Sequence, residues 1–431
     1  MIVRLLLAGI LLLLPAVRSV EANGRPPSTS TITFRRGMDA EIVAGTTFGL
    51  VKSVDGGATW RWVCEDSIGY GGMYDPDYAY SATGTLFATT FDGLKANRDG
   101  CRFEMTPSGK RFVSTTALGP DGALYFAAAD SMDGKIYKST DDGNTFPTSS
   151  MPGTTKDWWQ SLEVAPSNPN RLYLAGYRVE IGLPKVFFLN RSDNGGQTWI
   201  PLPVVDFATM PNSTIEIAGI SRTDPDRLYA RVTLEDNTIS DAIYRSTNGG
   251  QNWTRVLGKP DSIAFLVRGT GELVAATRAA GTFRSADQGA TWQPVPAAPH
   301  INCLTESAAG EVWACTQNYA NMQQPSDGAA IMKSVDLVAW TKVLRFQDIY
   351  EPVACNAGTP QRDSCDAELW CGLCAQLGCD PQRSCPGFPS TDGPPAGGVG
   401  CCETGGGGGA AGAFALSALV AFVLSRSRRR S

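Results

Sequence analysis

Hydrolytic chemistry needs only a few side chains of defined type, and this sequence offers few of them. The chain of 431 residues contains one histidine, His300. A Ser-His-Asp hydrolase would need this histidine beside a serine and an aspartate, and no Gly-x-Ser-x-Gly phrase provides the serine. One histidine also cannot form a histidine metal site. We therefore predict no metal and no cofactor, and we expect His300 to be exposed at the rim of the fold.

Glycoside hydrolysis is less demanding, because two carboxylates that flank a cleft are enough. The sequence pairs no two of its candidate carboxylates, so we interpret each of them as a solvated loop charge. We accordingly predict no catalytic residue and favour a protein that is not an enzyme, with an extracellular glycoside hydrolase as the alternative. The candidates, which lie in loops that lead into predicted strands, are Glu65, Asp66, Asp157, Glu216 and Asp261.

Aromatic side chains are the better candidates for contact with a ligand, because flat rings beside polar groups suit sugars and peptide chains. Tyr70 and Tyr74 lie in a tyrosine-rich loop, and Trp158 and Trp159 open a predicted strand. Tyr319 lies in a polar insertion at 316–328. The alternative for these rings is packing between the structural units of the fold.

Twelve cysteines could bind metal or form disulfides. The Cys371-Gly-Leu-Cys374 spacing is compatible with zinc, but the absence of a nearby histidine and the export signal described below favour disulfides. We expect Cys303 to pair with Cys315, because the two fall on neighbouring predicted strands, and we expect Cys64 to pair with Cys101. The connectivity of six further cysteines stays open: Cys355, Cys365, Cys371, Cys374, Cys379 and Cys385. We interpret residues 349–389 as a small disulfide module.

The elements that must position these residues follow from a phrase that returns seven times between residues 53 and 340. Its Asp or Asn can accept hydrogen bonds from backbone N–H groups, its Gly supplies a positive φ, and its Ser adds a further bond. The closing aromatic residue begins the next strand and packs inward. The phrase therefore predicts a tight hairpin turn. Its structural residues in the clear copies are Ser53, Asp55, Gly57, Trp60, Ser139, Asp141, Gly143, Ser192, Asn194, Gly196, Trp199, Ser246, Asn248, Gly250, Trp253, Ser285, Asp287, Gly289 and Trp292.

Two short apolar strands precede each copy, as at 41–44 and 49–53, and no stretch shows a sustained helical period. The copies recur about every 45 residues, which is the length of a four-stranded propeller blade. We therefore predict an all-β fold: a seven-bladed β-propeller of four-stranded antiparallel blades over residues 29–348. Loops that enter the inner strands converge at one mouth of such a ring, where the candidate aromatic residues would meet.

The repeated phrase resembles the Asp box, or BNR repeat, of sialidases, sortilin-type receptors, xyloglucanases and photosystem assembly factors. The resemblance implies a propeller whose boxes lie at outer turns, away from any ligand. Sialidases also carry an early Arg-Ile-Pro phrase, whereas residues 33–36 read Thr-Phe-Arg-Arg. Xyloglucanases pair two propellers around a groove, and we predict one here. A sialidase-like or xyloglucanase-like hydrolase using a carboxylate pair is therefore the alternative function.

Both ends of the chain indicate export. Residues 1–22 combine Arg4, an apolar run and a small-residue cleavage site after Ala22, as in a secretory signal. Charged residues make up 18% of the chain and its net charge is −5, so no basic footprint favours nucleic acid. We expect an exported protein that does not bind nucleic acid.

The C-terminal end combines a Gly/Pro linker at 390–404, a Cys401-Cys402 pair and an apolar segment with an arginine-rich tip at 405–431. We predict a single apolar helix there, just long enough to span a bilayer, with its arginines in the cytoplasm. The segment is similar to the myxobacterial sorting tail MYXO-CTERM. That resemblance implies a sorting protease, modification at Cys401 or Cys402, and display at the cell surface or outer membrane. A permanent membrane anchor is the alternative.

Together these features predict an exported, cell-surface propeller that binds a glycan or a protein at its central mouth without catalysis. Its other expected partners are the membrane, through the C-terminal segment, and the sorting protease.

Overall fold

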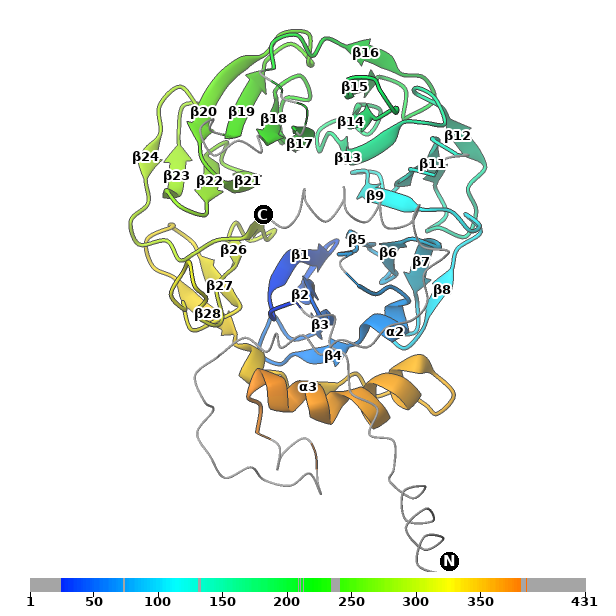
Figure 1. Cartoon of the computed structure of the whole chain (residues 1–431), viewed down its shortest axis with the longest axis vertical. Coiled ribbons are helices and arrows are strands. Elements are labelled where there is room, and N and C mark those ends of the chain that lie inside the picture. Colours follow the sequence, from blue (N-terminus) through cyan, green and yellow to red (C-terminus); the bar gives the residue numbers. More distant parts are fainter. Residues whose placement is uncertain are drawn as a thin grey trace, which may run out of the picture.

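The protein is a closed ring of seven antiparallel β-sheets, each with four strands in chain order (Figure 1). We describe it from a computed structural model, which covers residues 25–380 and 385 apart from 73, 131–132, 208, 210, 212 and 234–240. The predicted seven-bladed propeller is therefore confirmed. The ring begins with β1 as the innermost strand of blade 1 and closes with blade 7, because β1 packs against β25 and β26.

The strands divide evenly among the blades. Blade 1 contains β1 (Thr29–Arg35), β2 (Met38–Thr46), β3 (Gly49–Ser53) and β4 (Arg61–Val63); blade 2 contains β5 (Tyr78–Tyr80), β6 (Leu86–Thr90), β7 (Gly93–Asn97) and β8 (Phe103–Met105); blade 3 contains β9 (Val113–Leu118), β10 (Leu124–Ala128), β11 (Ile136–Ser139) and β12 (Thr148–Ser150); blade 4 contains β13 (Trp158–Val164), β14 (Leu172–Arg178), β15 (Val186–Ser192) and β16 (Ile200–Leu202). Blade 5 contains β17 (Thr214–Ile220), β18 (Leu228–Thr233), β19 (Asp241–Ser246) and β20 (Thr254–Lys259); blade 6 contains β21 (Ser262–Val267), β22 (Leu273–Thr277), β23 (Gly281–Ser285) and β24 (Gln293–Pro294); blade 7 contains β25 (Cys303–Glu306), β26 (Val312–Cys315), β27 (Ile331–Ser334) and β28 (Thr341–Leu344).

The core lies between neighbouring blades and is built mainly from the second strand of each blade. In β6, β10 and β22 every residue is buried. These strands read as short runs of apolar, alanine and threonine residues because each of their faces meets another blade, so neither face can be polar. The stacking of seven such sheets buries the apolar surface that no single blade could bury alone.

The repeated phrase forms the turn between the third and fourth strands of a blade; we call these the repeat turns. In blade 1 the Ser53 hydroxyl accepts a hydrogen bond from the Gly57 N–H at 2.9 Å, and the Asp55 carboxylate accepts one from the Thr59 N–H at 2.9 Å. Gly57 has φ = +91°. A Cβ there would lie 2.7 Å from Cγ1 of Val343 in β28, so the turn of blade 1 packs directly against blade 7. The repeat turns thus also bind neighbouring blades together.

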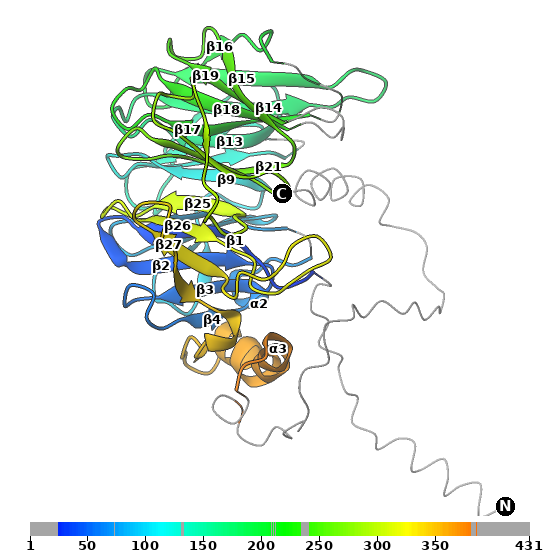
Figure 2. The same cartoon turned by 90° about the vertical axis from the view of Figure 1, so that its left-hand side faces the viewer.

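The segment after blade 7 packs on the outside of blades 1 and 2, as Figures 1 and 2 show. It contains η1 (Phe346–Asp348), β29 (Glu351–Pro352), the π-helix η2 (Gln361–Leu369) and α3 (Trp370–Leu377). β29 pairs in parallel with β4 and extends blade 1 to five strands. The π-helix η2 contacts the short helix α2 (Glu65–Ile68). Trp370 is 1% exposed and packs against Trp62 of β4, with ring centroids 5.6 Å apart. The segment therefore shares its core with the ring.

The disulfides correct part of the predicted pairing. Cys303–Cys315 is confirmed, but Cys64 bonds to Cys365 and Cys101 bonds to Cys355 rather than to each other. The reason is that β29 runs along β4 and leads the C-terminal segment past the outer edges of blades 1 and 2. Within this segment Cys371 bonds to Cys385.

Cys374 and Cys379 were expected in disulfides, but both are free and buried in the structure. Their side chains are hydrogen-bonded to each other. They lie at the end of α3, where the turn after the helix brings the two thiols together.

The remaining predictions for the termini concern residues outside those that the structure describes. These are the signal at 1–22, the linker with Cys401 and Cys402, and the apolar helix at 405–431. Within the described ranges, no helix has the length and apolar character needed to cross a membrane.

Candidate functional site

A large hollow of about 1930 Å³ opens at the centre of the ring, and we call it the mouth. It lies on the face where the chain enters each inner strand. Thr31 of β1, Thr115 of β9 and Ser161 of β13 line it from three different blades. The repeat turns lie at the other ends of the strands, so the ligand-accessible face and the structural turns are on opposite sides of the ring.

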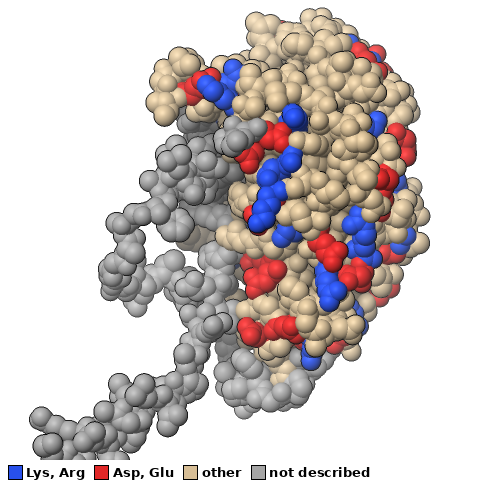
Figure 3. All heavy atoms as spheres, turned by 90° about the vertical axis from the view of Figure 1, so that its right-hand side faces the viewer, with Lys and Arg blue, Asp and Glu red and all other residues tan. Residues whose placement is uncertain are grey.

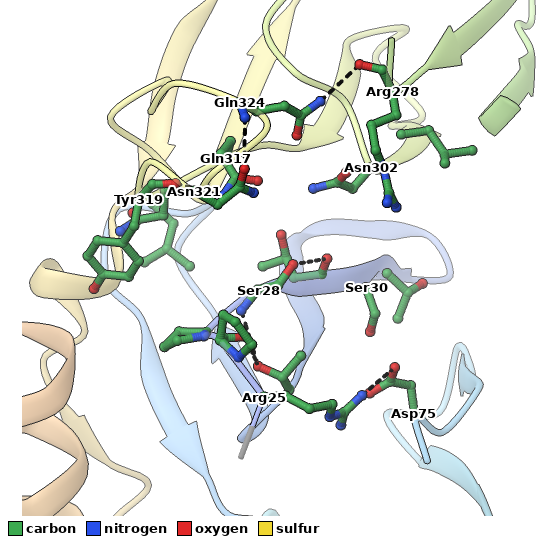
Figure 4. Close-up of a pocket in the computed structure, with 18 of the residues that line it drawn as sticks. Arg25, Ser28, Ser30, Asp75, Arg278, Asn302, Gln317, Tyr319, Asn321 and Gln324 are labelled. Carbon is green, nitrogen blue, oxygen red and sulfur yellow. Dashed lines mark hydrogen bonds and ion pairs between the residues drawn. The ribbon is translucent and has the colours of Figure 1, made fainter. Parts of the chain in front are cut away.

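Three segments raise the wall of the mouth above the inner strands (Figure 4). The first is the stretch that leads into β1, which is held by a bond from the Ser28 N–H to the Thr47 hydroxyl at 3.1 Å. The second is the loop between β26 and β27, which projects from one face of the ring in Figure 2. The third is the end of α3. Its Leu377 carbonyl accepts a hydrogen bond from the hydroxyl of Tyr319 in that loop at 2.7 Å.

Amide side chains are a main component of the lining. Gln160 of β13 has a buried Oε1 atom that receives no hydrogen bond in the part of the chain that the structure describes. Buried acceptors are rarely left without a donor, so this atom is suited to a donor from a bound molecule or water. The other amide residues of the mouth are Asn302, Gln317, Asn318, Asn321, Gln323, Gln324, Gln347 and Gln376.

Most of the charges that line the mouth are already paired with a neighbouring side chain. Arg25 contacts Asp75 at 2.9 Å, Arg231 of β18 contacts Glu216 of β17 at 2.6 Å, and Arg345 contacts Asp348 at 2.6 Å. These pairs fix side-chain positions and leave little net charge at those places. The remaining charged residues that line the mouth are Asp77, Glu163, Arg278 and Lys342.

Glu163 of β13 and Asp77, just before β5, form the acidic part of the mouth. The Glu163 side chain is exposed to the hollow itself, but the surrounding walls of the mouth partly desolvate its carboxyl group. This desolvation, together with the negative charge of Asp77, raises the pKa of Glu163 to about 7. A carboxyl group in this state can be neutral close to pH 7 beside a second carboxylate.

Arg278, which follows β22, lines the mouth together with a second cation, Lys342 of β28. No ion pair or hydrogen bond of its guanidinium occurs within the described residues, and Figure 4 shows it pointing into the mouth near Asn302. Its backbone is held on both sides, because its N–H donates to the Asp261 carbonyl at 2.9 Å and its carbonyl accepts from Gln324 Nε2 at 3.0 Å.

Three of the five aromatic candidates lie in the core, which corrects their expected role. Tyr70 is 8% exposed, Tyr74 is 9% exposed and Trp159 is 2% exposed. Their polar atoms bond inside the protein: the Tyr74 hydroxyl donates to the Val113 carbonyl at 3.1 Å, and Trp159 Nε1 donates to the Gly134 carbonyl at 2.9 Å. These rings join neighbouring blades, the alternative that the sequence had left open.

The other two aromatic candidates lie nearer to the mouth. Trp158 is half-buried at the start of β13, and its ring centroid is 5.8 Å from that of Phe112, which stacks on the exposed Phe91. Tyr319 lines the mouth directly. The structure therefore keeps Tyr319 as a candidate contact and places Trp158 beside the mouth rather than in its lining.

Of the five candidate carboxylates, only Glu216 lines the mouth, and it is paired with Arg231. Asp157 is buried in an ion pair with Arg178 at 2.6 Å. Glu65 and Asp66 belong to α2, and Asp261 lies in the turn between β20 and β21. Asp157 and Glu216 are therefore held in ion pairs, which corrects the prediction that they are solvated loop charges.

His300 differs from its prediction, because it is half-buried and not freely exposed. Its Nδ1 atom lies 2.9 Å from the Asp327 carboxylate, which also accepts a bond from the Gln317 N–H at 2.9 Å. This contact ties the loop between β26 and β27 to the start of blade 7.

Sequence reasoning missed Glu163, Asp77 and Arg278. For Glu163 a signal existed, because it is the one acidic residue of an inner strand that otherwise reads Trp-Trp-Gln-Ser-Leu and Val. For Asp77 and Arg278 no local signal exists, because each lies in an ordinary loop position.

Figure 3 shows basic and acidic side chains interspersed over one side of the molecule, without a large patch of a single sign on that side. That side of the molecule therefore offers no extended surface of one charge.

Comparison with known proteins supports the fold and is less specific about activity. No family model matches the chain. A xyloglucanase from Paenibacillus sp is 31% identical over 175 residues, which cover 34% of this chain and 16% of that protein. Among solved structures, an ancestral GH74 enzyme superposes with a TM-score of 0.51 at 14% identity, covering 68% of this chain and 44% of that one.

YCF48 from Cyanidioschyzon merolae has a TM-score of 0.47 at 14% identity, covering 67% of this chain and 92% of that one. The chain thus matches 16% of the length of the xyloglucanase and 44% of the length of the GH74 enzyme. At 14% identity, the similarity to the GH74 enzyme shows a shared fold and nothing more specific.

Proposed function

We propose that this protein is an exported propeller, displayed at the cell surface, that binds a glycan or a protein in its central mouth without catalysis. One observation carries the proposal. The mouth combines a large volume with a lining of amide and hydroxyl side chains, among them a Gln160 acceptor that lacks a donor. Such groups make directional hydrogen bonds and fix the orientation of a polar ligand.

The ion pairs of the mouth support binding over catalysis. Glu216 and Asp75 each form an ion pair with an arginine, which holds their side chains in place. A binding site benefits from side chains that are already held in place, because less freedom is lost when the ligand arrives.

Export is the second part of the proposal. Among the described residues, four disulfides bind the chain, two of them across more than 250 residues, and disulfides persist in oxidising compartments. The predicted signal and sorting tail would deliver the ring to the surface. The membrane and a sorting protease are accordingly its proposed partners besides the ligand.

A glycoside hydrolase is the second candidate function, and Glu163 is the observation that favours it. A carboxyl group with a raised pKa of about 7 near the second carboxylate of Asp77 is the arrangement in which one acid donates a proton while the other stays ionised. The partial similarity to a xyloglucanase is compatible with this candidate.

A glycan array combined with a hydrolysis screen on the purified protein separates the two functions. Binding without turnover, unchanged in Glu163→Gln, would support the binding role. Turnover that is lost in both Glu163→Gln and Asp77→Asn would overturn it in favour of a hydrolase. Glu104→Gln is the matched control, because Glu104 on β8 is exposed. Glu306→Gln would be unsuitable, because Glu306 forms ion pairs with two arginines.

A further inference from the structure

The connection between β14 and β15 projects from the same face of the ring as the loop between β26 and β27 (Figure 2). Residues 179–185 extend beyond the last paired residues of this hairpin, and we call them the finger. Ile181 is fully exposed, and Val179 and Leu183 each expose more than half of their surface. Exposed aliphatic side chains that gather in one place mark a contact with another protein or with a membrane.

The charged groups of the finger are held by its surroundings. The Glu180 carboxylate contacts Lys156 at 2.8 Å, which ties it to the loop before β13. The Lys185 ammonium donates to the Ser213 carbonyl at 2.5 Å and lies over the ring of Tyr177. The transfer of the aliphatic side chains out of water would therefore leave no isolated charge behind, which is the costly event in such a transfer.

A row of aromatic rings leads across the same face to the base of the finger. Phe91, in the turn between β6 and β7, is 45% exposed and stacks on Phe112 with ring centroids 5.1 Å apart. The ring of Phe112 lies 5.8 Å from that of Trp158, which pairs with Tyr177 near the end of β14. Tryptophan is enriched where a protein meets the boundary between a membrane and water.

The size of this surface favours a lipid bilayer over a protein partner. A standard protein interface uses about 20–30 residues on each side, whereas the finger and the aromatic row together contain about ten. A bilayer receives a projecting apolar loop without a matching groove, and the membrane is already a proposed partner through the C-terminal segment.

The chain length allows both membrane contacts at once. Residues 386–404 separate the described chain from the predicted apolar segment, and they can span at most about 60 Å. A compact domain of this size has a radius of gyration of about 20 Å. The C-terminal segment can therefore enter a membrane while the ring turns the finger toward the same membrane.

We propose that the finger inserts into the lipid bilayer on which the protein is displayed, as a second contact besides the C-terminal segment. Val179, Ile181 and Leu183 enter the apolar boundary of the bilayer, and Trp158 lies at the level of the headgroups. The contact goes beyond the proposed function, because the finger does not line the mouth and the contact holds for any ligand there. Since finger and mouth share one face of the ring, insertion keeps the mouth close to the membrane surface.

The test adds one tryptophan at an exposed aliphatic position. All ten tryptophans of the chain lie within residues 60–370, so the C-terminal segment contributes no emission. Ile181→Trp adds the reporter to the finger. Val338→Trp is the matched control, because Val338 is an exposed residue of the repeat turn of blade 7, on the opposite face of the ring.

Both variants of the full-length protein are reconstituted in phosphatidylcholine vesicles, with and without bromine on the acyl chains, because bromine quenches tryptophan emission on contact. The brominated lipid should quench the added emission of Ile181→Trp and leave that of Val338→Trp unchanged. Leu183→Asp, combined with Ile181→Trp, should remove the quenching, because a carboxylate opposes insertion. Leu183 is exposed, so its replacement should leave the melting temperature unchanged.

Vesicle flotation of the same samples measures the C-terminal anchor separately. Quenching of both reporters or of neither, in protein that floats with the vesicles, refutes the finger contact and leaves the proposed display intact. A protein that does not float refutes both. A blue shift of the Ile181→Trp emission that grows with protein concentration in the absence of lipid, and that Leu183→Asp removes, assigns the finger to a second copy of the chain and refutes the membrane contact.

Discussion

Two adjacent glycines in the repeat turn of blade 1 allow backbone strain and packing between blades to be measured separately. Gly56 and Gly57 have φ angles of +72° and +91°, so an alanine at either position is placed in a region that L-residues disfavour. This strain costs about 1–2 kcal/mol per residue. The two positions differ in their surroundings, because a Cβ at Gly56 has no atom within 4 Å, whereas one at Gly57 lies 2.7 Å from Val343 Cγ1.

Gly56→Ala should therefore lower the free energy of unfolding by the strain alone. Gly57→Ala should lower it by the strain and by about 1–3 kcal/mol more, which is the usual cost of overpacking a tight contact. Trp313 also lies 3.3 Å from the same Cβ position, so the added methyl group is crowded from two sides.

Guanidinium unfolding followed by tryptophan fluorescence measures both variants, and Gly57→Ala combined with Val343→Ala completes a double-mutant cycle. The removal of the Val343 methyl groups should cancel most of the extra loss. Equal losses of unfolding free energy for Gly56→Ala and Gly57→Ala, or no coupling to Val343, would show that the turn does not pack tightly against blade 7.

Four further predictions follow from the disulfides and the titratable groups. The double variant Cys64→Ser, Cys365→Ser should lower the free energy of unfolding by about 2–5 kcal/mol, measured in the same denaturant assay; no loss would mean that the C-terminal segment stays docked without that bond. Oxidised glutathione should join the Cys374 and Cys379 thiols, detected as a loss of two iodoacetamide-reactive sites after denaturation, and persistence of both sites would contradict their contact. Hydrogen bonds from Thr291 and Ser285 lower the pKa of Asp287 from 3.8 to about 2. The stabilising effect of the ionised Asp287 is therefore complete above pH 3.8 and is lost as the pH falls through about 2. Asp287→Asn, which copies Asn194 and Asn248, should keep the turn and remove this pH dependence from a plot of melting temperature against pH. The raised pKa of Glu163 has the opposite sign, since the folded state holds a proton that the unfolded state releases above pH 4.5; stability should fall as the pH rises from about 4.5 to about 7, and Glu163→Gln should remove this fall.

The architecture could be predicted from the sequence because the residues that specify each turn are close together in the chain and recur seven times. Each repeat turn is closed by bonds among residues that lie within five positions of one another, such as Ser53, Asp55 and Gly57. The strands before it are short apolar runs. Because the seven copies are regularly spaced and each sheet has two apolar faces to bury, the blades are expected to close into a ring. Cys303–Cys315 was predictable for the same reason, since both residues belong to one hairpin.

The roles of individual side chains could not be predicted in this way, because they depend on residues that are distant in the chain. Tyr70 and Trp159 look alike in sequence to residues that bind ligands, and only the stacking of blades buries them. Cys64 and Cys101 were assigned to each other because both lie in the ring, whereas β29 brings their true partners from residues 355 and 365.

The sequence by itself thus determined the turns, the strands and the number of blades, because these depend on backbone conformation and on apolar patterns within about 45 residues. Only the tertiary structure decided which charges line the mouth and which of them are paired. Glu163, Asp77 and Arg278 come from three different blades. The raised pKa of Glu163 arises from desolvation and from the charge of Asp77, which ring closure brings near, and neither effect has a signature in the neighbouring residues of the chain.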